Sequence, residues 1–468
     1  MKHEFIQLLS SNQGSSLMDA GRTHLVALVL ILFLVVLVVV ILSTFHASPH
    51  EGTPEHTQKK SVHGVKTAKD EQKEKEERSR SLSEVKVAVL YQRINDGQPP
   101  DRTLQDQIDM FKELHVDMIF RAWWRWRPCP DNLSEARKLI AEVGMPKEAY
   151  DRVVELRYTY DNLRRSIEAI KKELPGVIIC GAIPAQKLDA KIWDEITGRP
   201  IPPEKVRDMA FDPEKFGLHI SFEEAQEYLA KGSGYEIGQS YYPDITNPDF
   251  RRLMLEWAEK QIDAGVDAIW IDCLFRQALV LYRYTKDPSN KAVEESYKAA
   301  CELVDEIHRY GLARGKRIYV GTWAYALMEL PYKPCNLDFV TISPRSEEIL
   351  ALKMDEQFWD SYLSKIRERL GNVTIFAYLD WSTSPSSPTA VFSQKLTPAQ
   401  QREFLKIADR FFRERGVVFI YPLHGGCLGV GAKRLAFGRY YKYDALAPEF
   451  DTYEVIKELA ESAGEGAG

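Results

Sequence analysis

The sequence lacks the short cysteine and histidine spacings that bind metals or define small disulfide-rich domains. Its 6 cysteines are scattered over 468 residues without a CxxC pair, so neither a zinc knuckle nor a disulfide-dense scaffold is expected. One or two disulfide bonds are still possible if the domain faces an oxidising compartment. We therefore expect no metal site and no bound cofactor.

An excess of positive charge is also missing. Lys and Arg number 62 against 68 Asp and Glu, and the formal net charge is −6. This balance contains no basic patch large enough to predict nucleic acid as a partner. Aromatic residues make up 11% of the chain, which suits sugar faces and protein cores equally well. The oligomeric state is left open.

Motifs of three common α/β enzyme classes are absent as well. No GxGxxG motif follows the first predicted strand, which disfavours an open dinucleotide-binding sheet. That strand has no HxH pair for a metal-dependent amidohydrolase, and no predicted strand carries a lysine deep in its apolar run for Schiff-base chemistry.

What the sequence does contain is one long apolar run near its start. Residues 25–45, LVALVLILFLVVLVVVILSTF, carry no charge and are long enough to cross a bilayer as a helix. A cleaved signal peptide is the alternative, because Ala47 and Ser48 follow the run. We expect a single-pass anchor in the cell membrane after a short tail (1–24), with the lipid bilayer as a partner and the large domain outside the cytoplasm.

The rest of the chain divides into a linker and one domain. Residues 46–84 are charged and contain almost nothing apolar, so they cannot bury a core and are predicted to be a flexible linker. From 85 to 464, apolar strand-like runs alternate with amphipathic helices. The predicted strands are 85–91, 116–122, 177–183, 266–272, 317–322, 337–343, 373–378 and 417–421. Eight strands that are each followed by helix predict a (β/α)8 TIM barrel.

Two connections are longer than this repeat needs. Residues 184–242 separate the third and fourth strands, and 128–160 follow the second strand. Both exceed a normal βα connection. We expect the long insertion after strand 3 to fold over the C-terminal face of the barrel, where such barrels hold their sites.

Carboxylates, arginines and aromatic residues recur at the predicted C-terminal strand ends. The candidate catalytic acids are Asp272 after the fourth strand, Glu347 and Glu348 after the sixth, and Asp380 after the seventh. One of the adjacent tryptophans 123 and 124 is expected to point into the core. The residues expected to bind substrate are Tyr91, Arg93, Arg121, Trp123, Trp124, Asp244, Trp323, Arg345, Trp381, Tyr421 and His424.

These residue types fit the cleavage of a glycosidic bond. The bond breaks through an oxocarbenium-like state, so one carboxylate must attack or stabilise the anomeric carbon. A second, protonated carboxyl group must give its proton to the departing oxygen. Aromatic rings bind the apolar faces of sugars, and arginines bind hydroxyls or carboxylates. The sequence therefore predicts carbohydrate as the substrate.

The stretch YYPDITNPDFRRLMLEWAEKQIDAGVDAIWIDC, residues 241–273, resembles TIM-barrel glycoside hydrolases related to α-galactosidases and α-glucosidases. In that superfamily a DxxNP segment precedes a helix, and the fourth strand ends in the nucleophile. The resemblance implies that Asp272 is the nucleophile, with Asp244 and Asp267 as structural or substrate-orienting neighbours.

The chain departs from that superfamily at the general acid. The usual aspartate after the sixth strand is replaced by SPRSEE, so Glu347 or Glu348 would have to serve, and Asp380 is a rival. We therefore expect a divergent family. Which sugar is cleaved, and with which stereochemistry, stays open.

Two other functions remain open beside a membrane-anchored glycoside hydrolase. One is a cell-surface barrel that binds carbohydrate without cleaving it. The other is a barrel enzyme of another class that binds a phosphorylated ligand at the glycine-rich loop after the eighth strand. That loop contains Gly425, Gly426, Gly429 and Gly431, followed by Lys433 and Arg434.

Overall fold

The computed structural model describes residues 82–230, 238–437 and 441–465. The predicted tail 1–24, the predicted anchor 25–45 and nearly all of the predicted linker 46–84 lie outside these residues. Within the described ranges no helix combines the length and apolar character that crossing a membrane requires. The anchor thus stays a prediction.

Eight parallel strands close into a barrel. Their order is β1-β2-β3-β8-β9-β10-β11-β12, and β1 also pairs in parallel with β12, which completes the ring. The short strand β13 (Lys442–Asp444) adds to β12 in the antiparallel direction. The barrel strands are β1 (Ala88–Tyr91), β2 (Met118–Trp124), β3 (Ile178–Pro184), β8 (Ala268–Asp272), β9 (Tyr319–Trp323), β10 (Phe339–Ile342), β11 (Thr374–Ala377) and β12 (Val418–Cys427). Each predicted strand overlaps an observed one, and the (β/α)8 prediction is confirmed.

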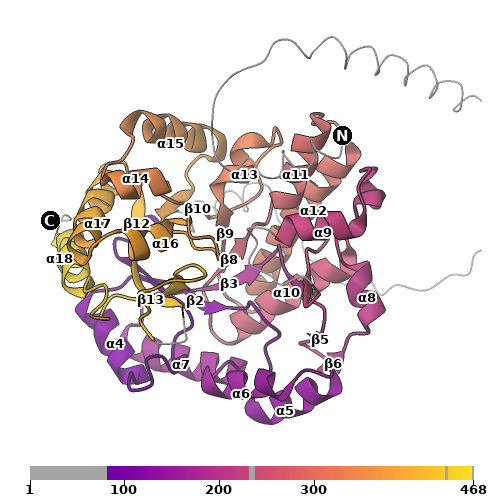
Figure 1. The fold of residues 1–468 in the computed structure, drawn as a ribbon, viewed down its shortest axis with the longest axis horizontal. Helices are drawn as coiled ribbons and strands as arrows, with labels where there is room; N and C mark the ends of the chain where they lie inside the picture. Colours follow the sequence, from indigo (N-terminus) through magenta and orange to yellow (C-terminus); the bar gives the residue numbers. More distant parts are fainter. Residues whose placement is uncertain (1–81, 231–237, 438–440, 466–468) are drawn as a thin grey trace, which may run out of the picture. The chain divides into compact units, whose positions relative to one another are not determined.

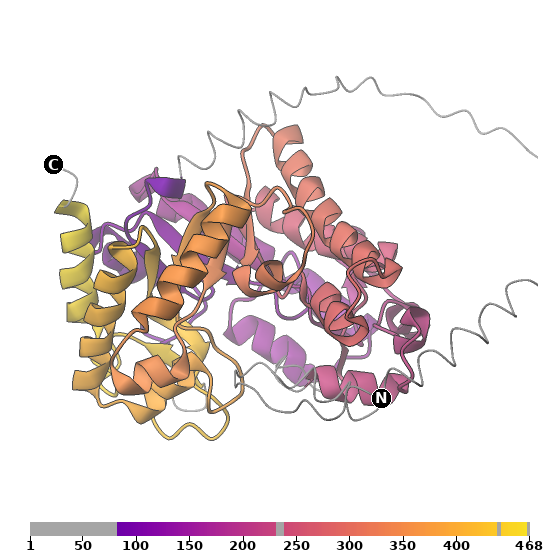
Figure 2. The same cartoon turned by 90° about the horizontal axis from the view of Figure 1, so that it is seen from above.

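Helices surround the strands in both views of the ribbon (Figure 1, Figure 2). They alternate with the strands along the chain, as the barrel requires. The helices outside the long insertion are α4 (Leu104–Glu113), α5 (Leu133–Glu142), α6 (Lys147–Glu155), α7 (Tyr160–Glu173), α10 (Pro248–Asp263), α11 (Arg276–Thr285), α12 (Lys291–Ala313), α13 (Ala324–Glu329), α14 (Ser346–Ala351), α15 (Glu356–Leu370), α16 (Pro388–Lys395), α17 (Pro398–Arg413) and α18 (Tyr453–Glu465).

Local sequence explains how α10 leads into β8. The Asn247 side chain caps the helix by accepting hydrogen bonds from the amides of Asp249 and Phe250, and Pro248 occupies the first turn. Gly265 then ends the helix at a φ of +109°, a conformation that favours glycine. A Cβ atom there would lie 3.0 Å from Ile167. The chain is thereby directed into the buried strand that ends at Asp272.

The barrel interior is packed with aromatic rings. Trp270 contacts Phe120 and Trp323 edge to face, with ring centroids 5.6 Å apart in each pair. Phe339 fills the space beside Gly321, where a Cβ atom would lie 2.3 Å from its ring. A second apolar layer lies between the strands and the helices. The inward-facing side chains of the barrel strands therefore pack against aromatic rings from other strands.

The long insertion between β3 and β8 is present, and its described residues contain short elements of their own. Two small two-stranded sheets pair β4 with β7 and β5 with β6. The elements are β4 (Leu188–Asp189), β5 (Trp193–Asp194), β6 (Arg199–Pro200), α8 (Pro203–Asp208), the 3-10 helix Pro213–Phe216, α9 (Phe222–Ala230) and β7 (Ser240–Tyr241).

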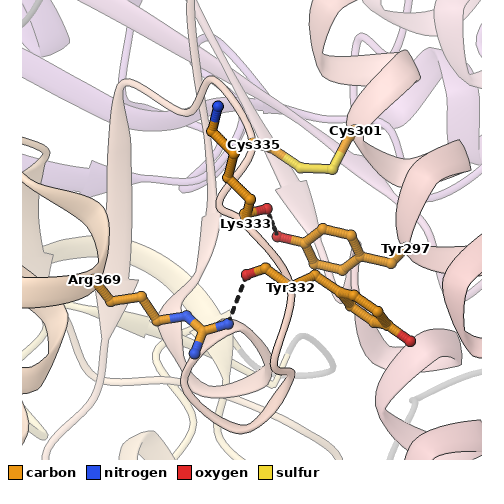
Figure 3. Close-up of a disulfide and its surroundings, with 6 residues drawn as sticks. All are labelled: Tyr297, Cys301, Tyr332, Lys333, Cys335 and Arg369. Atoms are coloured by element: carbon orange, nitrogen blue, oxygen red, sulfur yellow. Dashed lines mark hydrogen bonds between the residues drawn. A yellow bond between two sulfur atoms is a disulfide. The ribbon is translucent and has the colours of Figure 1, made fainter. Parts of the chain in front are cut away.

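One disulfide, between Cys301 and Cys335, joins α12 to the segment that precedes β10. Figure 3 shows it beside Tyr297, whose hydroxyl donates to the carbonyl oxygen of Lys333 at 2.8 Å. The other cysteines, all in the described part of the chain, are free thiols. The sequence allowed one or two disulfide bonds, and the structure contains one.

Candidate active site

Asp272 ends β8 and lies at the C-terminal face of the barrel. Its Oδ1 accepts a hydrogen bond from Trp323 Nε1 at 2.8 Å, and its Oδ2 accepts one from Gln186 Nε2 at 2.6 Å. Arg121 Nη2 lies 4.0 Å from Oδ2, and the Asp272 side chain is 14% exposed. The carboxylate is therefore held in a fixed orientation and can still be reached.

Asp380 follows β11 and is the second acid at this face. Its amide donates to Ser343 Oγ at 3.1 Å, and its Oδ1 accepts from the amide of Trp381 at 2.7 Å. Burial raises the pKa of Asp380 to about 7, and the charge of Asp272 adds to the effect, while Arg121 opposes it. Near neutral pH this group can therefore hold a proton and give it up.

Aromatic rings enclose the arginine that faces both acids. The Arg121 guanidinium carbon lies 3.7 Å from the ring centre of Trp381, 4.1 Å from that of Trp124 and 4.6 Å from that of Trp270. Trp126, which is partly exposed, stacks on Trp124 with ring centroids 5.2 Å apart. The acids thus lie beside a group of indole rings, which are suitable platforms for a sugar ring.

Of the predicted binding residues, Arg121, Trp124, Trp323 and Trp381 come together around the two acids. Trp124 is the inward-pointing member of the adjacent pair. Trp123 stacks on Tyr158 with ring centroids 4.9 Å apart, in the layer outside the barrel. The expectation that one of the two points inward is confirmed, and Trp123 is no longer a binding candidate.

The two glutamates after β10 do not join the acid pair. Glu348 is buried, and its oxygens accept from the amides of Arg345 and Asp355 and from Trp359 Nε1. Arg345 Nη2 donates to the same carboxylate at 3.1 Å. Glu347 is 70% exposed and lies 3.6 Å from Arg345 Nε. Glu348 and Arg345 therefore stabilise the start of α14, and neither glutamate remains a catalytic candidate.

Asp244 and Tyr421 also serve the framework. Asp244 is buried, and its Oδ1 accepts from the amide and hydroxyl of Thr246 and from Gln277 Nε2. The Tyr421 hydroxyl donates to Asp409 Oδ1 of α17 at 2.7 Å. Because that helix lies outside the barrel, Tyr421 points away from the acids. Both binding predictions are corrected here.

His424 and Tyr91 belong to a separate buried network beside β13. His424 Nδ1 lies 2.7 Å from Asp444 Oδ2, and its Nε2 lies 3.5 Å from Asp96 Oδ2. Lys442 Nζ donates to the same Asp96 oxygen at 2.6 Å. The Tyr91 ring covers the imidazole, with centroids 4.7 Å apart. His424 is 0% exposed, so it cannot contact a substrate in this arrangement.

Arg93 lies near this network, where its charge acts on Asp96 and Lys442. Its guanidinium carbon lies 5.5 Å from the ring centre of Tyr158. Its Nε is buried and has no hydrogen-bond partner among the described residues. A binding role for Arg93 stays a prediction.

The glycine-rich segment serves chain packing, and its first two glycines, Gly425 and Gly426, lie in β12 itself. A Cβ atom at Gly425 would lie 2.3 Å from that of Gln92, and the amide of Gly426 donates to Gln92 Oε1 at 2.9 Å. The amides of Lys433 and Arg434 both donate to Gln394 Oε1. These donors are already engaged, so nothing in the loop favours a phosphate over a tight turn. Within the described ranges no cluster of three or more His, Cys, Asp or Glu could hold a metal.

Sequence reasoning missed Gln186 and Trp126. Gln186 follows β3 by two residues, and its position at a strand end was the available signal. Trp126 follows the predicted strand 116–122 by four residues, close to Trp123 and Trp124 in the sequence. Neither residue type titrates, so neither drew attention in a search for acids and bases.

No protein-family model and no curated protein matches the chain. Similar solved structures include the glycoside hydrolase domain of PelA from Pseudomonas aeruginosa, at 14% identity and a TM-score of 0.31, covering 55% of this chain and 83% of that one. The cyclomaltodextrin glucanotransferase CldA is 13% identical over 81% of this chain and 80% of its own, with a TM-score of 0.45. An α-amylase from H.orenii is 11% identical over 81% and 82%, with a TM-score of 0.44.

The names of these structures describe a glycoside hydrolase domain, a glucanotransferase and an amylase. At such TM-scores the comparison carries no argument about the fold or the reaction. The barrel itself is established by the closed ring of parallel strands.

Proposed function

We propose that the chain is a glycoside hydrolase in which Asp272 and Asp380 are the catalytic pair. The observation that carries the proposal is the unequal environment of two acids at the same barrel face. Asp272 accepts two hydrogen bonds, as an ionised carboxylate does. Asp380 has its pKa raised to about 7 by burial and by the charge of Asp272. A carboxylate beside an acid that keeps its proton near neutral pH is the arrangement that acid catalysis requires.

Each group then has a defined step. Asp380 gives its proton to the glycosidic oxygen as the bond to the anomeric carbon breaks, and the leaving sugar departs as an alcohol. Asp272 either forms a covalent bond to the anomeric carbon or activates a water molecule that attacks it, depending on the separation of the two carboxyl groups. In the first case water hydrolyses the intermediate, with Asp380 now acting as the base.

The substrate we propose is a carbohydrate whose ring stacks on indole faces. Trp381 directly follows Asp380 and Trp126 stacks on Trp124; both are partly exposed, and their flat surfaces suit the C–H face of a sugar. Gln186, which already holds Asp272, has an Oε1 without a hydrogen-bond partner among the described residues. A sugar hydroxyl is a suitable donor to it.

The test is turnover of a panel of aryl glycosides and polysaccharides by the full-length chain. We expect activity in the wild type, loss in Asp272→Asn and in Asp380→Asn, and retention in the control Glu347→Gln. If wild type and Asp272→Asn are indistinguishable on every substrate, the catalytic assignment is wrong. Glycan binding without turnover would support a non-catalytic carbohydrate-binding barrel instead.

The second part of the proposal is that the chain is anchored in a membrane with its large domain outside the cytoplasm. The Cys301–Cys335 disulfide supports it, because such bonds persist in oxidising compartments. The apolar run 25–45 supports attachment to a bilayer. Fractionation and protease treatment of intact cells test both points. Recovery of the chain in the soluble cytoplasmic fraction with Cys301 reduced would contradict them.

A further inference from the structure

Arg121 occupies an unusual position on β2. Met118 and Phe120 face the barrel interior, whereas Ile119 faces the outer layer. By simple alternation Arg121 would also point outward. Its φ is +55°, and the pairing of β2 with β3 shifts register between Ile119 and Trp123. This bulge turns the guanidinium inward, against Trp270.

The inward position is costly for a charged side chain. Arg121 is 2% exposed, and its Nε has no hydrogen-bond partner among the described residues. Its ion pair with Asp272 is long, at 4.0 Å. Three indole rings offset part of the lost hydration through cation–π contact. Backbone strain and incomplete pairing in one residue often mark a functional role.

Arg125, which directly follows the same strand, is a buried arginine with a close ion pair, although its Nη1 has no hydrogen-bond partner among the described residues. It is equally buried and lies over Trp257 at 3.6 Å. Its Nε and Nη2 both donate to Glu195 Oε1, at 3.0 Å and 2.6 Å. Burial lowers the pKa of Arg121, but at Arg125 the charge of Glu195 and the effects of its other neighbours together outweigh burial and raise the pKa. Arg121 therefore has no anionic partner as close as Glu195 is to Arg125, and its positive charge can act on both Asp272 and Asp380.

We propose that Arg121 is a positioning residue that holds the negative charge of the acid pair on Asp272 and eases the release of the proton from Asp380. The inference rests on the proposed function and assigns the origin of the asymmetry between the two acids. A guanidinium 4.0 Å from Asp272 Oδ2 stabilises the ionised carboxylate there. The same cation also acts on Asp380, where it lowers the pKa against the effects of burial and of the Asp272 charge.

The other titratable groups around the pair do not supply this effect. They come from the segment before α10, the segment after β8, α13 and the end of β11. Burial raises the pKa of the thiol and of each phenol among them, so these groups stay neutral near pH 7. Arg276 acts on the thiol and on two of the phenols. The groups are Tyr242, Cys273, Arg276, Tyr325 and Tyr378.

The experiment compares full-length Arg121→Met and Arg121→Lys with the wild type in two measurements. The first is the pH dependence of kcat/KM on whichever glycoside is cleaved. Because Arg121→Met removes a cation near both carboxylates, we expect both limbs of the profile to move to higher pH, the acid limb by about 1–3 units. Arg121→Lys keeps the charge and should restore both limbs toward their wild-type positions.

The second measurement needs no substrate. pH-difference infrared spectroscopy follows the band of a protonated carboxyl group, which is assigned to Asp380 by its loss in Asp380→Asn. We expect the midpoint of this band to move to higher pH in Arg121→Met. Arg127→Met is the matched control, because it removes an exposed arginine from the same strand end and should leave the midpoint unchanged.

The outcomes separate the two proposals. If no glycoside is cleaved but the infrared midpoint shifts, the proposed function fails and the role of Arg121 stands. If activity falls in Arg121→Met while both limbs and the midpoint stay in place, Arg121 only packs the interior and the inference is overturned. Arg121→Gln, which is smaller and neutral but can still donate hydrogen bonds, replaces Arg121→Met if that variant does not fold.

Discussion

Two groups of acids lie at the C-terminal face of the barrel, and they differ in the cations that accompany them. Asp272 and Asp380 share Arg121, whose nearest contact with Asp272 is 4.0 Å. Asp96 and Asp444 are bound at 2.6 Å by Lys442 and Arg102 respectively. The second group is almost fully buried, whereas Asp272 and Asp380 keep part of their surface exposed.

The different pairing changes the proton affinity of the acids in opposite directions. Burial alone would raise the pKa of Asp96, but the charges of Lys442 and His424 outweigh it and lower the pKa well below its usual range. At Asp380 burial and the charge of Asp272 prevail, and the pKa rises to about 7. Complete pairing makes a buried acid a structural element. Incomplete pairing leaves it able to exchange a proton near neutral pH.

The sharpest test of this contrast is Asp272→Asn. The amide has a similar shape but cannot act as a nucleophile or a base, so we expect kcat to fall by about 10⁴-fold or more. The midpoint of thermal unfolding should stay close to that of the wild type, because the residue is partly exposed. Steady-state kinetics and calorimetry measure the two effects. A large drop in stability would place Asp272 with the structural acids.

Asp444→Asn should show the reverse. The substitution leaves Arg102 and His424 buried without their anionic partner, and breaking such a pair costs about 3–5 kcal/mol. Urea unfolding followed by circular dichroism measures the free energy of unfolding. Glu113→Gln, which removes a carboxylate from the surface pair with Lys457, is the control and should cost at most about 1 kcal/mol. An equally small loss in Asp444→Asn would show that the buried network does not hold the fold.

The pH dependence of activity should also distinguish Asp380 from the structural acids, with a smaller effect than the two substitutions above. Asp380 must be protonated to act as the acid, so kcat/KM should fall by about tenfold per pH unit above its pKa of about 7. A rate profile measured from about pH 4 to 9 tests this. An activity that stays level to pH 9 would exclude Asp380 as the general acid.

Stability should respond to pH with opposite signs in the two groups. The raised pKa of Asp380 means that the unfolded chain releases this proton first. The free energy of unfolding therefore decreases from about pH 4 to 7, and Asp380→Asn should remove that slope. The lowered pKa of Asp96 gives stability that is present above about pH 4 and is lost as the pH falls further. Urea unfolding across this range measures both slopes.

Glu347→Gln should have the smallest effect, at most about twofold in kcat/KM and within about 0.5 kcal/mol in stability. The side chain is 70% exposed, and its nearest cation, Arg345, lies 3.6 Å away. A loss of activity comparable with that of Asp380→Asn would return Glu347 to the list of candidate acids.

The sequence by itself determined the barrel. Strand runs such as 266–272 and caps such as Asn247 depend on local periodicity and hydrogen bonding, which are readable one segment at a time. The rule that barrel sites lie at the C-terminal strand ends then placed Asp272 and Asp380 among the candidate acids. The sequence also supplied Glu347 and Glu348, and nothing in it could rank them.

Only the tertiary structure decided which of these side chains meet. Glu348 was excluded by donors from Arg345, Asp355 and Trp359, and Tyr421 by its bond to Asp409. Arg121 joined the acids because a bulge reverses the face on which β2 presents it. Strand periodicity fixes which face a regular residue occupies, but a bulge and the partners across the barrel depend on contacts far apart in sequence. Those contacts decide which acids keep fixed charges and which can hold a proton.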